Sequence, residues 1–295
     1  MCRRFWVDFR HGMSRAIRSP VSEADRGTTP ARPPVAAPTD QEARGRSHKR
    51  SPRSFWEVDA LRGVAVVMMV VYHFVFDLAF LGVSDAVFRS PFWFYFQRVT
   101  ATTFVLLVGV SLHLRALSLT ARHGQLSFGP FFRRGLTVFG WGLVLTAVTW
   151  LAVGREQAIR FGILHFIGVA MLAAYPFLRL GAANLALGAA FLLFGKWLQT
   201  QTFDLPMAVW LGFEPANHTY LDYFPFIKWF GVVLLGLFAG SVLYGPDGRR
   251  YPTFSMSGWT PVRALRTIGV WSLPIYLLHQ PLLLGILLVW TAVVR

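Results

Sequence analysis

The chain has 295 residues, of which 54% are apolar, 16% are aromatic and only 15% are charged. A soluble protein of ordinary composition carries about a quarter charged residues, so this composition excludes a soluble enzyme and a nucleic-acid-binding domain. A single cysteine, Cys2, excludes a disulfide scaffold. The 29 Lys and Arg residues exceed the 14 Asp and Glu residues by 15. In a membrane protein such an excess reflects topology more than a nucleic-acid partner.

Residues 1–54 form a polar tail that is rich in Arg, Pro and Ser and holds twelve Lys and Arg residues. The tail has no apolar run of signal-peptide length. Its composition is typical of a segment that cannot bury enough apolar surface to fold. We therefore predict two parts: a disordered, cytoplasmic, basic tail at 1–54 and a single transmembrane domain at 55–295.

The rest of the chain is a succession of apolar segments, each near the ~20 residues that cross a ~30 Å hydrocarbon layer. The predicted fold class is all-α, a polytopic membrane helix bundle of about seven transmembrane helices. A pair of half-spans inside 199–226, which contains the apolar stretch 205–211, is an alternative for that connection. The seven expected spans are 56–80, 96–114, 135–153, 161–178, 182–198, 227–244 and 267–290.

The distribution of Lys and Arg predicts the orientation of these spans. With the N-terminus inside, the tail and the inner loops together hold 21 Lys and Arg residues, against seven on the outer side. Positive loops stay in the cytoplasm, so the predicted topology is N-in and C-out, in a plasma or bacterial inner membrane. The basic character then serves mostly as anchoring on the cytoplasmic side.

Glycines predict close helix packing at two places. Gly236 and Gly240 have the small-xxx-small spacing that lets a neighbouring backbone approach. Gly135, Gly140 and Gly142 favour the same for the third span. We interpret these glycines as structural.

The first span carries an ionisable face. Arg62 and His73 are eleven residues apart, which is three helical turns plus roughly 20°. Asp59 and Asp77 lie about 40° to either side of His73, so all four side chains project from one face over about 27 Å. A helix facing lipid does not carry such a stripe, so this face is expected to look into the bundle or a water-filled cavity.

Roles follow from spacing and depth. Asp59 and Arg62, at i and i+3, are expected to form an ion pair near the inner surface. His73 lies deeper, where a neutral imidazole can accept a proton and act as a general base. Asp77, one turn further out, is expected to orient that imidazole and stabilise its cation. The alternative for each of these residues is a structural contact between helices.

Three further ionisable residues are expected at the same outer level as His73. His165 opens the fourth span, His279 precedes Pro281 in the last span, and Asp222 lies in the loop before the sixth. As site residues, His165 or His279 would stabilise an oxyanion, and Asp222 would assist the base. Each one taken alone is more often a hydrogen bond between helices.

Five blocks of this sequence resemble the heparan-alpha-glucosaminide N-acetyltransferase catalytic-domain family, in its short bacterial branch. The similarity runs in collinear order from about residue 53 to 290. The spacing of Arg62 and His73, with ten residues between them, is also similar to a signature of the broader membrane acyltransferases that modify surface glycans. The blocks are 53–78, 161–166, 221–225, 229–236 and 275–281.

The resemblance implies transfer of an acetyl or other acyl group across the membrane, from cytoplasmic acetyl-CoA as co-substrate to a sugar amine or hydroxyl. It also implies that His73 is the catalytic base or acyl carrier and that Arg62 positions the donor. Arg133 and Arg134, on the inner side, are expected to attract the phosphates of CoA. The expected partners are the bilayer, acyl-CoA and a glycan or other small acceptor; no nucleic acid, metal or haem is expected.

Two other functions remain open from the sequence. A proton-coupled transporter or permease would use the same Asp and His residues as a relay, but it would be expected to show internal repeats with matching broken helices, and no clear repeat is visible. A b-type haem protein would need two histidines as axial ligands. The available ones are His73, His113, His165 and His279.

Overall fold

The computed structural model describes residues 55–83, 90–154, 158–203, 205–215, 222–252 and 256–294. These residues belong to one compact unit, Pro52–Arg295. The predicted tail, 1–54, lies outside the described residues, as do the loops between the ranges.

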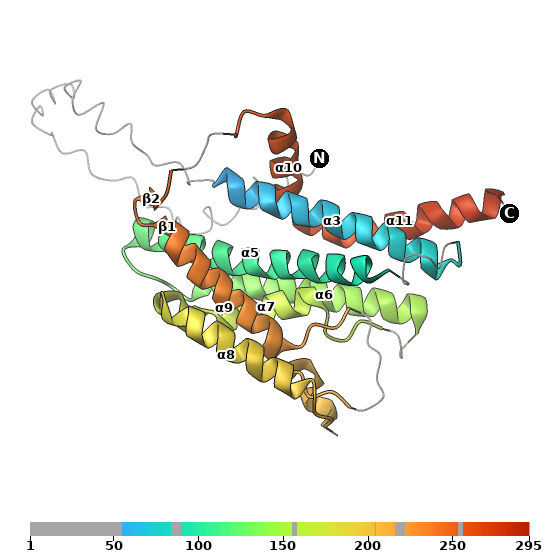
Figure 1. Cartoon of the computed structure of the whole chain (residues 1–295), viewed down its shortest axis with the longest axis horizontal. Coiled ribbons are helices and arrows are strands. Elements are labelled where there is room, and N and C mark those ends of the chain that lie inside the picture. Colours follow the sequence, from blue (N-terminus) through green and yellow to red (C-terminus); the bar gives the residue numbers. More distant parts are fainter. Residues whose placement is uncertain are drawn as a thin grey trace, which may run out of the picture. The chain divides into compact units, whose positions relative to one another are not determined.

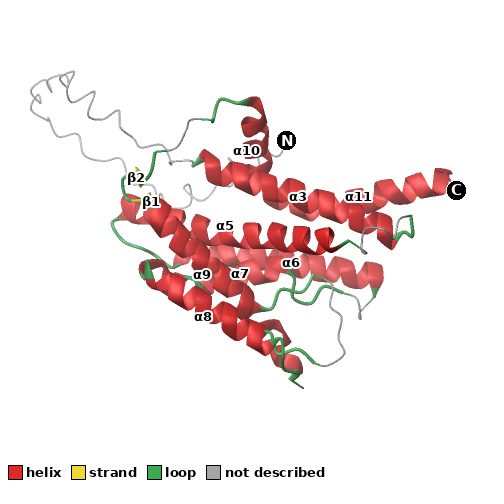
Figure 2. Cartoon of the chain, in the orientation of Figure 1, coloured by secondary structure: helices red, strands yellow, loops and turns green. Residues whose placement is uncertain are grey.

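Helices make up nearly all of the regular structure in the described part of the chain, which confirms the all-α class (Figure 2). Five of them are long and apolar enough to cross a membrane, whereas α7 and α8 are apolar but shorter. The five are α3 (Trp56–Phe80), α5 (Pro91–His123), α6 (Gly129–Val153), α9 (Phe226–Leu243) and α11 (Ser272–Val294). The other helices are α7 (Ile163–Ala173), α8 (Ala183–Leu198), α10 (Thr260–Val270) and the 3₁₀ helices η1 (Tyr175–Arg179) and η2 (Pro206–Leu211). Figure 1 shows their arrangement.

The segment predicted as a last span at 267–290 is two helices, a correction to the sequence-based boundary. α10 ends at Val270, Trp271 interrupts the helix, and α11 begins at Ser272. Pro274 lies in the first turn of α11, where its missing N–H would have no partner within the helix and so costs nothing. In the connection 199–226, where half-spans are the alternative, the apolar stretch forms the short 3₁₀ helix η2, and residues 204 and 216–221 lie outside the described residues.

The helices pack in pairs around small residues. A Cβ on Gly109 of α5 would overlap the backbone oxygen of Val233, and one on Gly236 of α9 would overlap that of Leu106. Any side chain at either position would therefore push α5 and α9 apart.

The other predicted glycine contacts have mixed outcomes. Gly240 packs on the His113 ring and Gly135 on Leu172 of α7, as expected, and Gly142 packs on the ring of His165. A Cβ on Gly140 would meet no described atom within 4 Å, so Gly140 makes no such contact in this structure. Between these pairs lies a core whose largest fully buried side chains are Phe131, Phe166 and Phe230.

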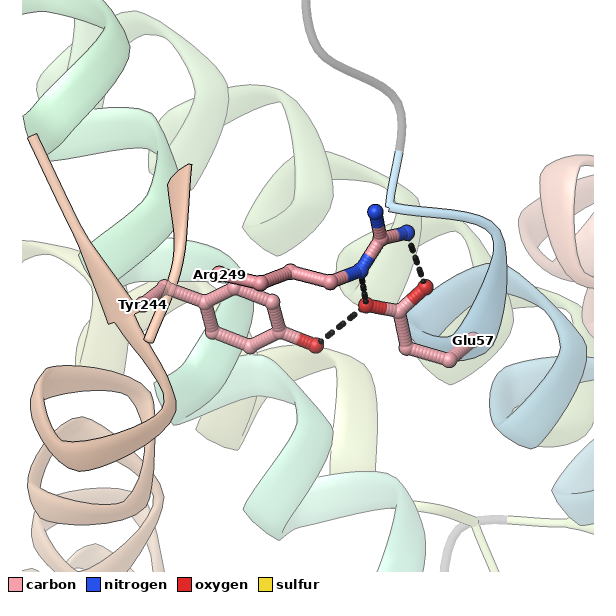
Figure 3. Close-up of polar contacts among 3 residues, drawn as sticks. All are labelled: Glu57, Tyr244 and Arg249. Atoms are coloured by element: carbon pink, nitrogen blue, oxygen red, sulfur yellow. Dashed lines mark hydrogen bonds and ion pairs between the residues drawn. The ribbon is translucent and has the colours of Figure 1, made fainter. Parts of the chain in front are cut away.

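A short hairpin follows α9 and holds the start of α3. Its strands, β1 (Tyr244–Gly245) and β2 (Gly248–Arg249), are antiparallel. The guanidinium of Arg249 donates two hydrogen bonds of 2.7 Å to the two carboxylate oxygens of Glu57 in α3, and the Tyr244 hydroxyl donates a third of 3.0 Å (Figure 3). The bond with Glu57 raises the pKa of Arg249, while burial and the nearby carboxylate raise the pKa of Tyr244. The first turn of α3 is thereby fixed in position.

Candidate active site

A cavity of about 400 Å³ lies among α3, α5, α6, α7, the segment before α9 and the junction of α10 with α11. This volume is in the range of sites that bind small molecules and cofactors. The polar side chains that line it come mainly from α3 and α5. They are Arg62, Tyr72, His73, Gln97, Thr100, Ser111, Arg115, Arg134, Asp222, Ser272 and Tyr276.

One end of the cavity is cationic, and we call it the arginine end: Arg62, Arg115 and Arg134. Arg62 forms the expected ion pair with Asp59 at 3.0 Å and also donates to the Ser111 hydroxyl at 2.8 Å. The Nε atom of Arg115 is buried and has no hydrogen-bond partner among the described residues. The charges of Arg62 and Arg115 both repel that of Arg134. Three guanidinium groups gathered at one end of a cavity favour an anionic ligand.

The wall between the two ends is apolar. Met69 of α3 and Phe104, Leu107 and Val108 of α5 contribute to it. Arg62 and His73 are both on the cavity side of α3, and eleven residues of helix separate their Cα atoms by about 16 Å. The cavity is thus elongated and has chemically different ends.

The opposite end, which we call the histidine end, is formed by His73, Tyr276 and Asp222. Nδ1 of His73 lies 2.9 Å from the backbone oxygen of Met69. A carbonyl oxygen only accepts, so Nδ1 must carry the hydrogen, and Nε2 of the neutral ring is left unprotonated. His73 therefore lines the cavity and carries a ring nitrogen, Nε2, that can accept a proton.

His279 lies against His73 and does not line the cavity itself. The two rings meet edge to face with their centroids 4.8 Å apart. Nδ1 of His279 lies 2.7 Å from the backbone oxygen of Tyr276, so it must donate there, and Nε2 is buried without a partner among the described residues. Both histidines therefore have the same tautomer.

Asp77 does not make the expected contact with His73. Its Oδ1 accepts a 2.7 Å hydrogen bond from the side-chain amide of Gln280, and its Oδ2 has no partner among the described residues. The side chain is 2% exposed. The expectation that Asp77 orients the imidazole directly is not met, because the Met69 backbone oxygen fills that position.

Asp222 connects two parts of the bundle at the histidine end. Its Oδ2 accepts from the backbone N–H of Ile163 at 3.3 Å, at the start of α7, and from the Tyr276 hydroxyl of α11 at 3.2 Å. Burial raises the pKa of Asp222 to about 6, although both hydrogen bonds oppose the shift. The residue has φ 48°, a left-handed conformation that is uncommon outside glycine and that Asp tolerates better than most.

His165 is not brought into this cavity. Its Nδ1 accepts from the Gly162 backbone N–H at 3.3 Å, so Nε2 carries the hydrogen and donates to the Thr146 hydroxyl, also at 3.3 Å. That hydroxyl in turn donates to the backbone oxygen of Ile159 at 2.6 Å. Both ring nitrogens are satisfied, and the ring is 3% exposed between α6 and α7.

Two differences concern the residues expected to bind the donor. Arg134 lines the cavity but Arg133 does not, and Arg115, which is not among the residues expected to bind the donor, lines it as well. A sequence signal for Arg115 exists: Gln97, Thr100, Ser111 and Arg115 lie within about 60° of one another around α5. This polar face of α5 lines the same cavity as the polar face of α3. No group of three or more His, Cys, Asp or Glu side chains within the described ranges is placed to hold a metal ion.

Residues 54–281 match the family described as "Heparan-alpha-glucosaminide N-acetyltransferase, catalytic". No curated protein and no solved structure gives a significant match. The matched range includes every residue of both ends of the cavity, as well as His279 and Gln280.

Proposed function

Because the chain belongs to the heparan-alpha-glucosaminide N-acetyltransferase catalytic family and is therefore a membrane acetyltransferase, we propose that its donor is cytoplasmic acetyl-CoA. We further propose that the acceptor is a sugar amine or hydroxyl on the other side of the membrane. One observation carries the proposal: a single cavity has three arginines at one end and an unprotonated imidazole nitrogen at the other.

The arginine end suits the phosphates of CoA. Guanidinium groups bind phosphate through charge-assisted, often bidentate hydrogen bonds. Arg115 has a buried Nε without a partner among the described residues, and Arg134 lines the cavity beside it. From there a pantetheine arm, a flexible chain with two amide groups, would follow the apolar wall toward His73.

The histidine end suits acyl transfer. The acceptor nitrogen or oxygen attacks the thioester carbon while Nε2 of His73 takes its proton. The new bond to the acyl carbon forms, the carbon–sulfur bond breaks, and the proton passes from His73 to the departing CoA sulfur. General-base help of this kind contributes about 10²–10⁴-fold in rate. Tyr276 and Asp222, which line the same end, would contact the acceptor.

A transfer assay tests the proposal. The whole chain in nanodiscs is incubated with radiolabelled acetyl-CoA and glucosamine, and thiol release and labelled product are followed. His73→Asn is the informative variant, because the Asn amide can still donate to the Met69 oxygen while Nε2 is lost. We expect a loss of about 10²–10⁴-fold.

The matched control is His113→Gln. His113 contacts the Tyr244 backbone oxygen through Nε2, a bond that a Gln amide can reproduce, and it does not line the cavity. Its rate should equal that of the wild type. Full activity in a folded His73→Asn variant would contradict the role of His73, and a wild type that neither binds nor turns over acetyl-CoA would favour the transporter function.

A further inference from the structure

Behind the cavity, α3 and α11 bury a group of polar side chains whose hydrogen-bonding capacity is incompletely used. Three acceptor atoms in this contact are buried and have no partner among the described residues: Oδ2 of Asp77, Nε2 of His279 and Oε1 of Gln280. Asp77 is 2% exposed and His279 is 8% exposed. An unpaired buried acceptor typically costs about 1–3 kcal/mol, so three in one contact call for a functional reason.

All three free atoms are acceptors, because the Nδ1 hydrogen of His279 is used on the Tyr276 oxygen and the Gln280 amide donates to Asp77. The charge is unbalanced in the same way, since no ion pair with Asp77 is formed among the described residues. A buried carboxylate without a cation is expensive. One added proton would neutralise the charge and could be shared between two of the three unpaired acceptors.

The geometry links this group to the cavity through His73. The His73 and His279 rings are in edge-to-face contact, and Asp77 follows His73 by one helical turn on the same face. The other titratable groups around the pair are Tyr72 on α3, Tyr276 on α11 and, through Tyr276, Asp222. The nearby polar cavity residues of α5, Gln97 and Thr100, do not titrate.

We propose that His73, His279 and Asp77 form one proton-sharing cluster, in which His279 and Asp77 are positioning residues that act through His73. The proposal rests on the proposed function for its role in catalysis. When the acceptor attacks, the proton it loses enters the cluster at His73 and makes the cluster neutral overall. The same proton returns from His73 to the CoA sulfur as the thiolate leaves, so the cluster is unchanged after each turnover.

The first test measures the pH dependence of kcat for acetyl transfer. His279→Asn keeps a donor for the Tyr276 oxygen but removes Nε2, and Asp77→Asn keeps an acceptor for the Gln280 amide but removes the charge. If the groups share a proton, their titrations are coupled, and each variant should shift the pH midpoint of kcat by about one unit or more. A lower rate with an unchanged midpoint in both variants would show a merely structural role and overturn the proposal.

The second test does not depend on activity. Infrared difference spectra of the wild type in nanodiscs, recorded across a pH titration, should contain a carboxyl C=O stretch from a buried protonated acid. Asp222 is a second buried carboxyl that can give such a band, so the variants are made in the Asp222→Asn background. The band that remains there should be absent after Asp77→Asn and should titrate at a different pH after His279→Asn. A wild type without transfer activity that gives these spectra would contradict the proposed function alone, whereas a spectrum unaffected by Asp77→Asn or by His279→Asn would overturn the cluster.

Discussion

Two helix–helix contacts in this bundle bury histidines, and the two contacts differ in how completely the buried polar groups are hydrogen-bonded. Between α6 and α7, both nitrogens of His165 are hydrogen-bonded, and the chain of donors ends on the Ile159 backbone oxygen. Between α3 and α11, His279 and Asp77 each retain a free buried acceptor among the described residues. Buried polar groups that are fully paired are typical of structural contacts, whereas unpaired ones need an explanation. This difference supports our proposal that the α3–α11 contact is the one that takes part in chemistry.

Removing a charge from the arginine end is expected to have a large effect on the KM for acetyl-CoA. This prediction separates donor binding at the arginine end from the chemistry proposed at the α3–α11 contact. Arg115→Gln should raise KM for acetyl-CoA by about 10–100-fold, the value of one charge-assisted hydrogen bond of about 1.5–3 kcal/mol. kcat should change little. Arg133→Gln is the control, because Arg133 does not line the cavity. Steady-state kinetics of both variants measure these effects. Equal changes in KM for the two variants would contradict the proposal that Arg115 binds the donor.

Asp222 joins the two contacts, because it accepts from Ile163 of α7 and from Tyr276 of α11. Burial raises its pKa from 3.8 to about 6, so the folded state binds the proton more tightly than the unfolded chain does. The stability this provides is complete below about pH 4 and is lost as the pH rises through about 6, by at most about 3 kcal/mol.

Thermal unfolding in detergent between pH 4 and 8 measures this loss. The wild type should lose more stability across this window than Asp222→Asn does. A parallel pH dependence in the two proteins would show that Asp222 does not titrate as described.

The α6–α7 contact should respond in stability alone. His165→Ala leaves the Gly162 N–H without its acceptor and removes the donor to the Thr146 hydroxyl, which keeps its bond to the Ile159 oxygen. The free energy of unfolding should fall by about 1–3 kcal/mol. Transfer per folded molecule should stay at the wild-type level. Unfolding temperature and specific activity are measured on the same preparation. A loss of activity without a loss of stability would show that His165 belongs to the site and would contradict the structural role of the α6–α7 contact.

The smallest effect is expected at the hairpin that holds α3. Arg249→Lys removes the two-pronged bond to Glu57 but keeps the charge (Figure 3). Both side chains are partly exposed, so the free energy of unfolding should fall by about 1 kcal/mol or less. Chemical denaturation measures it. A much larger loss, or a loss of activity, would mean that the hairpin controls the site.

The features predicted correctly from sequence are those that depend on one segment at a time. Hydropathy gives the long helices, and the i,i+3 spacing gives the Asp59–Arg62 pair, because both are local. Helical periodicity also places His73 and Arg62 on the cavity side of α3.

Partners across helices could not be predicted in the same way. Depth along a span placed His165 level with His73, but depth does not fix the rotation of α7, which turns His165 toward α6. The bond of Asp77 to Gln280 depends on the register of α3 against α11, which no local pattern encodes. Arg115 was missed although the polar face of α5 was readable from its spacing.

Equilibrium binding of radiolabelled acetyl-CoA to the nanodisc-reconstituted chain tests most directly the claim that the two ends of one cavity divide binding from chemistry. His73→Asn should bind acetyl-CoA with the affinity of the wild type and fail to transfer the acetyl group, while Arg115→Gln should bind about 10–100-fold more weakly. Wild-type affinity in Arg115→Gln, or loss of binding in His73→Asn, would contradict the account.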